Sequence, residues 1–157
     1  GGTTFHDPAE AMPPIEADVH TTPEELNDLM DKLHTPRSLH ARARGVHTSA
    51  LSDGREILFL AEDIGRHNTI DKLAGLAMLH GTSTAGQMLL TTGRVSSEML
   101  RKAATMGCPI IASRNSPTSL AVSLGEAWNI TLVGYVRRMT LRAYTLAELL
   151  GCRLEAG

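Results

Sequence analysis

Apolar residues follow two alternating patterns along most of this chain. Short, nearly continuous apolar runs alternate with longer stretches in which apolar residues return every three or four positions. The first pattern is typical of buried strands and the second of helices with one buried face. The alternation predicts helices at about 66–80, 96–106, 117–128 and from 146, and strands at 87–91, 109–112, 131–136 and about 141–144.

An antiparallel hairpin is predicted ahead of this alternation. The apolar runs 46–51 and 56–61 flank Ser52-Asp53-Gly54-Arg55, and Asp-Gly between two such runs is a strong signal for a tight turn. The later strands are joined through helices, which predicts parallel pairing with right-handed crossovers. The expected fold class is therefore α/β, a three-layer α/β/α sandwich whose mixed sheet opens with an antiparallel hairpin.

Residues 1–44 show a different pattern from the rest of the chain. Residues 1 to about 21 mix Gly, Thr, Pro and acidic residues without a period, as in a loop or tether. Thr22-Pro23-Glu24-Glu25 then forms a capping box with proline at the first helical position, followed by apolar residues at helical spacing. We expect a helix there and a second short one at about 37–44. The chain thus divides into an N-terminal tether with helices, 1–44, and an α/β domain, 45–157.

Composition and charge narrow the range of partners. The 157 residues carry a net charge of -2 and 3% aromatic residues, so we expect neither the basic field nor the aromatic platforms of a nucleic-acid binder. We recognise no signal peptide and no apolar run of membrane length, and expect no membrane partner. Residues 1–45 hold 4 Lys and Arg against 8 Asp and Glu, whereas residues 46–157 hold 11 against 9. Any anion site is therefore expected in the second part.

The two cysteines, Cys108 and Cys152, form neither a C-x-x-C pair nor a zinc-ligand spacing. Cys108 lies between Gly107 and Pro109 at the start of an apolar run, which favours a small buried thiol over a reactive one. Two unpaired thiols fit a reducing, cytoplasmic setting.

Three junctions between a predicted strand and the next helix carry clustered polar side chains. Because the carboxyl ends of parallel strands lie at one edge of a sheet, we expect these junctions to be neighbours. Each has an arginine at or just before a helix N-terminus, where free N–H groups and the helix dipole also favour an anion. We therefore predict a site for a phosphate or diphosphate. Its candidate residues are Asp63, Gly65, Arg66, His67, Asn68, Thr92, Gly93, Arg94, Ser96, Ser113, Arg114, Ser116 and Thr118.

The acidic residues near these junctions allow other interpretations. The three arginines could pair with Glu62, Asp63, Asp71 and Glu98 instead of binding a ligand. Asp63 and Glu62 could hold Mg²⁺ beside a phosphate, accept hydrogen bonds from a guanine, or orient Arg66 and its neighbour.

The same region contains histidines and serines that could act as catalytic groups. His67 and Asp71 lie one helical turn apart, as in a hydrolytic His–Asp pair, but no nucleophile motif accompanies them. Ser96 and Ser97 are more typical of helix caps than of nucleophiles. His47, in the first strand of the hairpin, is more readily explained by packing than by a role in the site.

Three separated segments carry a resemblance to a known family: EDIGRHNTIDK at 62–72, TGRVSSE at 92–98 and SRNSPTSLA at 113–121. In these segments the chain resembles the FdhD/NarQ family, the formate dehydrogenase accessory sulfurtransferases. Segments 45–48 and 131–135 are similar to that family as well. The resemblance covers about residues 45–145 and is specific, because the three segments occur in the same order.

The resemblance implies a cytidine-deaminase-like fold, a homodimer and binding of the molybdenum cofactor in its bis-molybdopterin guanine dinucleotide form. It also implies relay of sulfur from a cysteine desulfurase to that cofactor before its insertion into formate dehydrogenase. The anion site predicted from the residues agrees with this, because the cofactor carries diphosphates and guanines.

The chain departs from the family pattern in its cysteines. The family relays sulfur on a C-x-x-C loop upstream of the matching region, and neither Cys108 nor Cys152 corresponds to it. The start at Gly1-Gly2 suggests that this loop and an N-terminal domain precede the first residue, so this chain is expected to bind cofactor without transferring sulfur by itself. The zinc motif of deaminases is missing as well, so the fold likeness implies no deaminase activity.

Two other classes of function stay open at this point. A nucleotide hydrolase or deaminase-type enzyme would use His67 with Asp71 or Glu62. A docking module for a desulfurase or dehydrogenase would instead place its function in the acidic N-terminal segment.

Overall fold

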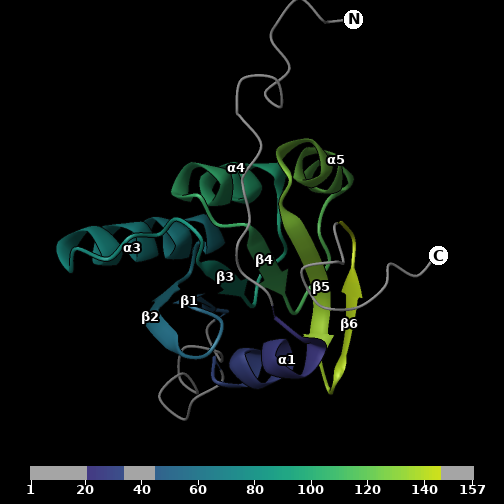
Figure 1. Ribbon diagram of the computed structural model, residues 1–157, viewed down its shortest axis with the longest axis horizontal. Coiled ribbons are helices and arrows are strands. Elements are labelled where there is room, and N and C mark those ends of the chain that lie inside the picture. The colour runs from purple at the N-terminus through teal and green to yellow at the C-terminus, as the bar shows by residue number, and fades with distance from the viewer. Residues whose placement is uncertain (1–20, 34–44, 146–157) are drawn as a thin grey trace, which may run out of the picture.

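The computed structural model describes residues 21–33 and 45–145 (Figure 1). The short helix predicted at 37–44, the helix predicted from 146 and Cys152 lie outside these residues. None of the helices in the described ranges is long and apolar enough to cross a membrane.

The strands of the described residues form one six-stranded mixed sheet in the order β2-β1-β3-β4-β5-β6 (Figure 1). β1 pairs antiparallel with both β2 and β3, the strands β3, β4 and β5 pair parallel, and β6 pairs antiparallel with β5. The predicted opening hairpin is confirmed. Its first strand, β1, joins the hairpin to the rest of the sheet by pairing with β3. The bounds are β1 His47–Ser52, β2 Ile57–Asp63, β3 Met88–Thr91, β4 Ile110–Ser113, β5 Thr131–Arg137 and β6 Thr140–Ala143.

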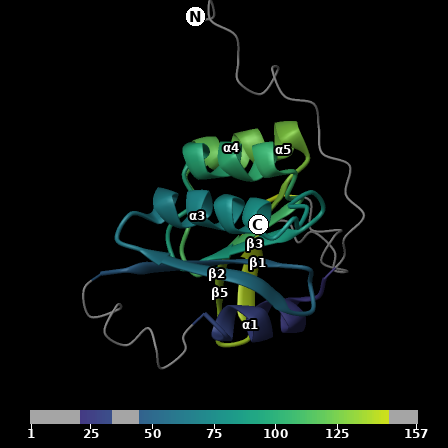
Figure 2. The same cartoon turned by 90° about the vertical axis from the view of Figure 1, so that its left-hand side faces the viewer.

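Helices cover both faces of this sheet (Figure 2). On one face lie α3 (Arg66–Leu79), α4 (Ser97–Met106) and α5 (Ser119–Trp128), and on the other lies α1 (Pro23–Asp31). The fold of the described residues is thus α/β, with a six-stranded mixed sheet flanked by four helices, and each of these elements starts within about two residues of the predicted position.

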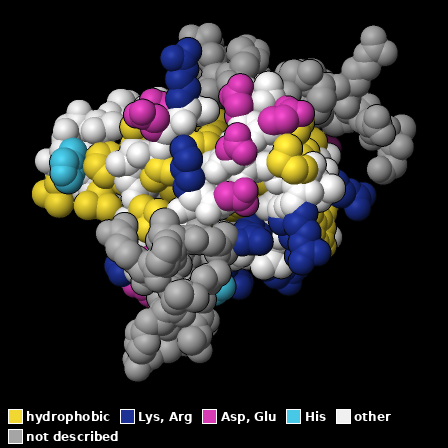
Figure 3. Space-filling model, turned by 90° about the horizontal axis from the view of Figure 1, so that it is seen from below, with side chains coloured by type: hydrophobic (Ala, Val, Ile, Leu, Met, Phe, Trp, Pro, Cys, Tyr) yellow, Lys and Arg dark blue, Asp and Glu magenta, His cyan; other side chains and the backbone are white. Residues whose placement is uncertain are grey.

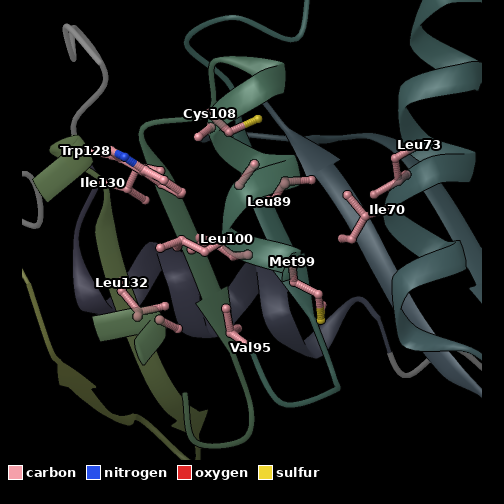
Figure 4. Packing of buried hydrophobic residues seen from close by; sticks show 14 of the residues in the cluster. Ile70, Leu73, Leu89, Val95, Met99, Leu100, Cys108, Trp128, Ile130 and Leu132 are labelled. Atoms are coloured by element: carbon pink, nitrogen blue, oxygen red, sulfur yellow. The ribbon is translucent and has the colours of Figure 1, made fainter. Parts of the chain in front are cut away.

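Alternating side chains along the strands divide the core in two. Leu51 and Leu89 point toward α3, α4 and α5 and belong to one buried cluster, whereas Ala50 and Leu90 belong to the cluster under α1. Figure 4 shows the larger cluster, in which Leu100 and the ring of Trp128 are buried against the sheet.

Local signals in the sequence account for the starts of these elements. Thr22 caps α1 by accepting a hydrogen bond from the amide of Glu25 at 3.1 Å. In the hairpin turn, Asp53 Oδ1 accepts from the amides of Arg55 and Glu56, both at 2.8 Å, and Gly54 has a φ of 98°. Both features follow from residues within one turn of chain, which is why the pattern alone predicts them.

The face covered by α1 is acidic over that helix (Figure 3). Its exposed side chains include Glu24, Glu25, Asp28 and Asp31. The acidic side chains over α1 disfavour an anion at that part of the face. The charge distribution therefore directs attention to the ends of the strands under α3, α4 and α5.

Candidate functional site

Four strands bring their ends to the same edge of the sheet, which we call the rim. Because β1 is antiparallel to both β2 and β3, these two strands run in the same direction, and β4 runs parallel to β3. The carboxyl ends of β2, β3 and β4 at Asp63, Thr91 and Ser113 therefore lie along the rim. The first residue of β1, His47, lies there as well, paired in register with Asp63. The topology thus places the three predicted junctions side by side.

The β3–α4 and β4–α5 loops run parallel to each other and have the same length. Thr91 pairs with Ser113, a further bridge joins Val95 to Pro117, and the amide of Thr118 donates to the carbonyl of Val95 at 3.0 Å. Each loop ends in a hydroxyl cap. Ser96 accepts from the amide of Met99 at 3.3 Å, and Thr118 accepts from the amide of Ala121 at 3.2 Å.

This register sets Arg94 and Arg114 at different positions along the two loops. Arg94 is equivalent to Ser116, and Arg114 is equivalent to Thr92, so the two arginines do not occupy corresponding positions of their loops. Arg94 is exposed and Arg114 is half-buried. No described contact joins the guanidinium groups of these two residues to Arg66. Sequence spacing could not show this, because the loops are aligned by strand pairing and not by their arginines.

The β2–α3 junction is built differently. Its helix begins after Gly65, which makes no side-chain cap, and the loop is shaped by Asp63 instead. Asp63 Oδ1 accepts from the amide of Gly65 at 2.9 Å and from Asn68 Nδ2 at 3.2 Å, while Asp63 Oδ2 lies 2.8 Å from Lys72 Nζ. The hydrogen bond from Lys72, followed by those from Gly65 and Asn68, lowers the pKa of Asp63 to about 2.

These contacts limit what Asp63 and Gly65 can do. Both oxygens of Asp63 are engaged within the loop, so the carboxylate orients Lys72 and Asn68 and not Arg66. A Cβ at Gly65 would lie 2.9 Å from Asn68 Nδ2, so the glycine allows that side chain to reach Asp63.

Arg66, the first residue of α3, packs against the next junction. A Cβ at Gly93 would lie 3.2 Å from Arg66 Cβ and 3.2 Å from His47 Nδ1, so three elements meet at this glycine. Arg66 Nε is buried and has no hydrogen-bond partner among the described residues. Burial and the charge of Arg66 together lower the pKa of His47. His47 therefore lies beside the site, which the sequence interpretation had not favoured.

The acidic neighbours do not neutralise the arginines. Within the described residues, no carboxylate forms an ion pair with Arg66, Arg94 or Arg114. Three of the four acidic residues considered as their partners are engaged elsewhere: Asp63 with Lys72, Asp71 with Lys102, and Glu98 with His67. The guanidinium charges at the rim are therefore not compensated by described side chains.

A chain of buried hydroxyl groups runs under the rim and links the junctions. Thr69 Oγ1 donates to the carbonyl of Arg66 at 2.6 Å and lies 2.7 Å from Ser49 Oγ. Ser49 Oγ donates to Thr91 Oγ1 at 2.9 Å, and the amide of Gly93 donates to the same oxygen at 3.2 Å. Ser49, Thr69 and Thr91 are all fully buried. These hydroxyls hold the backbone of Arg66 and Gly93 in place.

Sequence reasoning missed these hydroxyls. The available signal was a Ser or Thr at an inward position near the end of an apolar strand, as at Ser49 and Thr91. Thr69 carries a weaker signal, because a threonine in the first turn of a helix is common without a polar partner on a strand.

The neutral candidate residues mostly serve the loops themselves. Ser113 Oγ donates to the carbonyl of Gly93 and accepts from the amide of Asn115 at 2.9 Å. Thr92 Oγ1 accepts from the amide of Thr48 at 3.0 Å. Gly93 uses both its N–H and its C=O internally, so its role is to make room for neighbouring side chains. Ser116 is half-buried beside this network.

The alternative His–Asp pair is not formed. Asp71 accepts from Lys102 Nζ at 2.8 Å with each oxygen, whereas His67 Nδ1 lies 3.6 Å from Glu98 Oε2. The Asp71–Lys102 pair crosses a groove of about 240 Å³ between α3 and α4, away from the rim. Among the described residues, no three His, Cys, Asp or Glu side chains are grouped as metal ligands. The His67–Asp71 pair that the sequence allowed is therefore replaced by an Asp71–Lys102 pair.

Cys108 is a core residue, as predicted. Its thiol is buried among the side chains under α4 and α5 (Figure 4), and Sγ lies 3.6 Å from the carbonyl of Thr84. Burial raises the pKa of Cys108 to about 12, so the thiol stays protonated and unreactive at neutral pH.

Comparison with known proteins places this geometry in a family. The model of the FdhD/NarQ family matches residues 2–150. The chain belongs to the FdhD/NarQ family. Both parallel loops and the β2–α3 junction fall within the matched range.

Individual FdhD relatives give the same result. The chain is 42% identical over 124 residues to the sulfur carrier protein FdhD of Listeria monocytogenes, covering 79% of this chain and 48% of the relative. It is 36% identical over 157 residues to the protein of the same name from Streptomyces coelicolor, covering 99% and 54%. The chain thus spans about half the length of the curated FdhD proteins it matches.

A solved structure shows the same fold. The crystal structure of a putative formate dehydrogenase accessory protein from Desulfotalea psychrophila matches with a TM-score of 0.81 and 29% identity. The match covers 94% of this chain and 63% of that one. The likeness to the FdhD family therefore extends from the sequence segments to the arrangement of the sheet and helices.

Proposed function

We propose that this chain is the cofactor-binding part of an FdhD sulfur carrier that serves formate dehydrogenase. In this proposal the rim binds a phosphate group of the molybdenum cofactor in its bis-molybdopterin guanine dinucleotide form. Support comes from membership of the FdhD/NarQ family and from relatives named sulfur carrier protein FdhD. The uncompensated positive charge at the rim supplies the chemical argument.

One observation carries the proposal, namely the unsatisfied Nε of Arg66. This atom is buried and has no partner among the described residues, and a buried donor left unpaired costs about 1–3 kcal/mol. The amides at the start of α3 lack a side-chain cap, so they add partial positive charge next to the guanidinium. A phosphate oxygen would satisfy both groups, and charge-assisted hydrogen bonds of this kind are among the strongest in proteins.

In this proposal the residues at the rim hold a phosphate of the dinucleotide, with roles that differ from residue to residue. Arg66 would hold the phosphate directly, and the exposed Arg94 and half-buried Arg114 would add charge on the two neighbouring loops. Asp63 would shape the β2–α3 loop and not read a guanine, because both its oxygens are engaged. The cofactor, when bound, supplies the metal that accepts sulfur. This chain binds and orients it.

The described residues favour binding over sulfur transfer in this part of the protein. The one cysteine among them, Cys108, is buried and protonated. Relay from a cysteine desulfurase, delivery to formate dehydrogenase and assembly as a homodimer belong to the proposal through the family resemblance. A cytidine-deaminase-like fold enters in the same way.

Calorimetric titration with GDP tests the proposal. GDP carries the guanine and diphosphate of the cofactor's dinucleotide, and GMP and guanosine serve as probes that lack one or both phosphates. We expect saturable binding of GDP that weakens in the order GDP, GMP, guanosine. Arg66→Ala should weaken GDP binding by about tenfold or more, because a charge-assisted hydrogen bond is lost.

Arg55→Ala is the matched control, because Arg55 is an exposed arginine in the hairpin turn at the opposite end of β1 and β2. Its GDP affinity should equal that of the unchanged protein. The absence of saturable heat at millimolar GDP, or equal losses in Arg55→Ala and Arg66→Ala, would contradict an anion site at the rim.

A further inference from the structure

His47 shares the rim with Arg66 through the placement of β1. Odd-numbered side chains of β1 point toward α3, because Ser49 contacts Thr69 of that helix and Leu51 belongs to the core beneath it. His47 continues this row at the start of the strand. The imidazole therefore lies on the same side of the sheet as the first turn of α3.

Gly93 allows His47 and Arg66 to approach each other. A Cβ at this position would lie 3.2 Å from His47 Nδ1 and 3.2 Å from Arg66 Cβ, which is closer than most real contacts. The backbone of Gly93 is held by Thr91 and Ser113, so the peptide cannot move aside freely. A glycine here lets side chains from β1 and α3 meet at the β3–α4 loop.

The charges around His47 disfavour its protonation in the free protein. Arg66 faces it from α3, and burial together with this charge lowers the pKa of His47. On β2 its register partner is Asp63, whose carboxylate is held by Lys72. Arg94 follows Gly93 on the third element. Near neutral pH the imidazole is therefore uncharged, with one donor and one acceptor nitrogen.

We propose that His47 is a second binding residue for the anion held by Arg66, and that it takes up a proton when the anion binds. The inference rests on the proposed anion site. An oxyanion next to Arg66 offsets the guanidinium charge that opposes protonation of the imidazole. The resulting imidazolium donates a charge-assisted hydrogen bond to the same oxyanion.

Proton uptake on binding GDP is the quantity to measure. Titrations at about pH 6.5, near the ordinary pKa of histidine, in two buffers of different ionisation enthalpy give the number of protons taken up. His47→Gln should take up fewer protons than the unchanged protein. It should also bind GDP on the order of tenfold more weakly at that pH, and the difference should shrink at about pH 8.

Protonation of GDP itself does not affect the comparison, because both proteins bind the same ligand. His80→Gln is the control variant, since His80 is exposed at the other end of α3. It should match the unchanged protein in both affinity and proton uptake.

Two variants separate this inference from the proposed function. If Arg66→Ala loses GDP binding while His47→Gln keeps normal affinity and proton uptake, the anion site stands and the role of His47 is overturned. If Arg66→Ala binds GDP normally, the anion site itself fails. Should His47→Gln not fold, the pKa of His47 can be followed by NMR in the unchanged protein. A pKa that rises when GDP is added supports the inference, and an unchanged pKa overturns it.

Discussion

The β2–α3 junction differs from the pair of loops after β3 and β4 in how the start of the following helix is capped. In the paired loops, Ser96 and Thr118 cap the helices that follow, and the loops bond to each other. At the β2–α3 junction no side chain caps the helix, and Arg66 Nε has no partner among the described residues. The helix starts are thus capped by side chains in the two paired loops and left uncapped in the third.

This difference suggests where a ligand is needed. Buried polar groups are nearly always paired in folded proteins, so an unpaired one marks either strain or a missing partner. Both paired loops cap their helices with side chains of their own, whereas the β2–α3 junction does not. An anion is the partner that its guanidinium and free amides have in common.

The largest expected effect separates the three arginines. Arg66→Ala should reduce GDP affinity by more than Arg94→Ala or Arg114→Ala, because Arg66 is the one arginine of these three with a buried nitrogen that has no hydrogen-bond partner among the described residues. Arg94 is exposed, and an exposed charge contributes about 0–1 kcal/mol. Calorimetric titration of the three variants gives the order. Equal losses of GDP affinity in the three variants would show that the β2–α3 junction has no special role in binding.

The next effect concerns the chain of buried hydroxyl groups that links the junctions under the rim. Thr91→Val should lower the free energy of unfolding by about 1–3 kcal/mol, because Ser49 Oγ and the amide of Gly93 lose a buried partner. Urea unfolding monitored by circular dichroism measures it. Thr105→Val on the exposed side of α4 is the control and should stay within about 0.5 kcal/mol. If Thr91→Val loses no more stability than the control, the chain of hydroxyl groups does not stabilise the rim.

A smaller effect tests the helix caps of the two paired loops. Ser96→Ala and Thr118→Ala should each cost about 1 kcal/mol of stability, because each removes the acceptor for a helix amide. Ser97→Ala, one residue into α4, is the matched control and should cost less. A loss of stability in only one of the two variants would contradict the equivalence of the paired loops that their register indicates.

The smallest effect is a dependence of stability on pH, which arises at the β2–α3 junction. Because the pKa of Asp63 is about 2 instead of its usual 3.8, folding favours its ionised form. The stability it contributes is complete above about pH 4 and is lost as the pH falls toward 2. Asp63→Asn should therefore show a flatter dependence of the urea midpoint on pH across that range. An identical slope in both proteins would mean that the Asp63–Lys72 pair does not stabilise the loop.

Predictions from the sequence succeeded where a signal is local. The hairpin turn at Asp53-Gly54 and the cap at Thr22 depend on residues within four positions of each other. The apolar period is similarly local, and it predicted the order of helices and strands. These signals persist in the fold because the tertiary structure uses the same backbone geometry.

Predictions failed where the partner is distant in sequence. Asp71 is bound by Lys102, 31 positions away, and not by His67 in its own helix. Ser49 reaches Thr69 and Thr91, which are 20 and 42 positions away. Each strand end was predicted to carry an arginine near the next helix, yet the pairing of Val95 with Pro117 places Arg94 and Arg114 at different positions of their loops.

The amino-acid sequence by itself determined the elements, their order and the presence of an arginine near each of three strand ends. It could do so because helix caps, turns and apolar periods act over a few residues. Only the tertiary structure decided that β1 lies between β2 and β3, that His47 stands beside Arg66, and which arginine keeps an unpaired nitrogen. Those outcomes depend on strand order and on contacts between distant residues, which no local pattern contains.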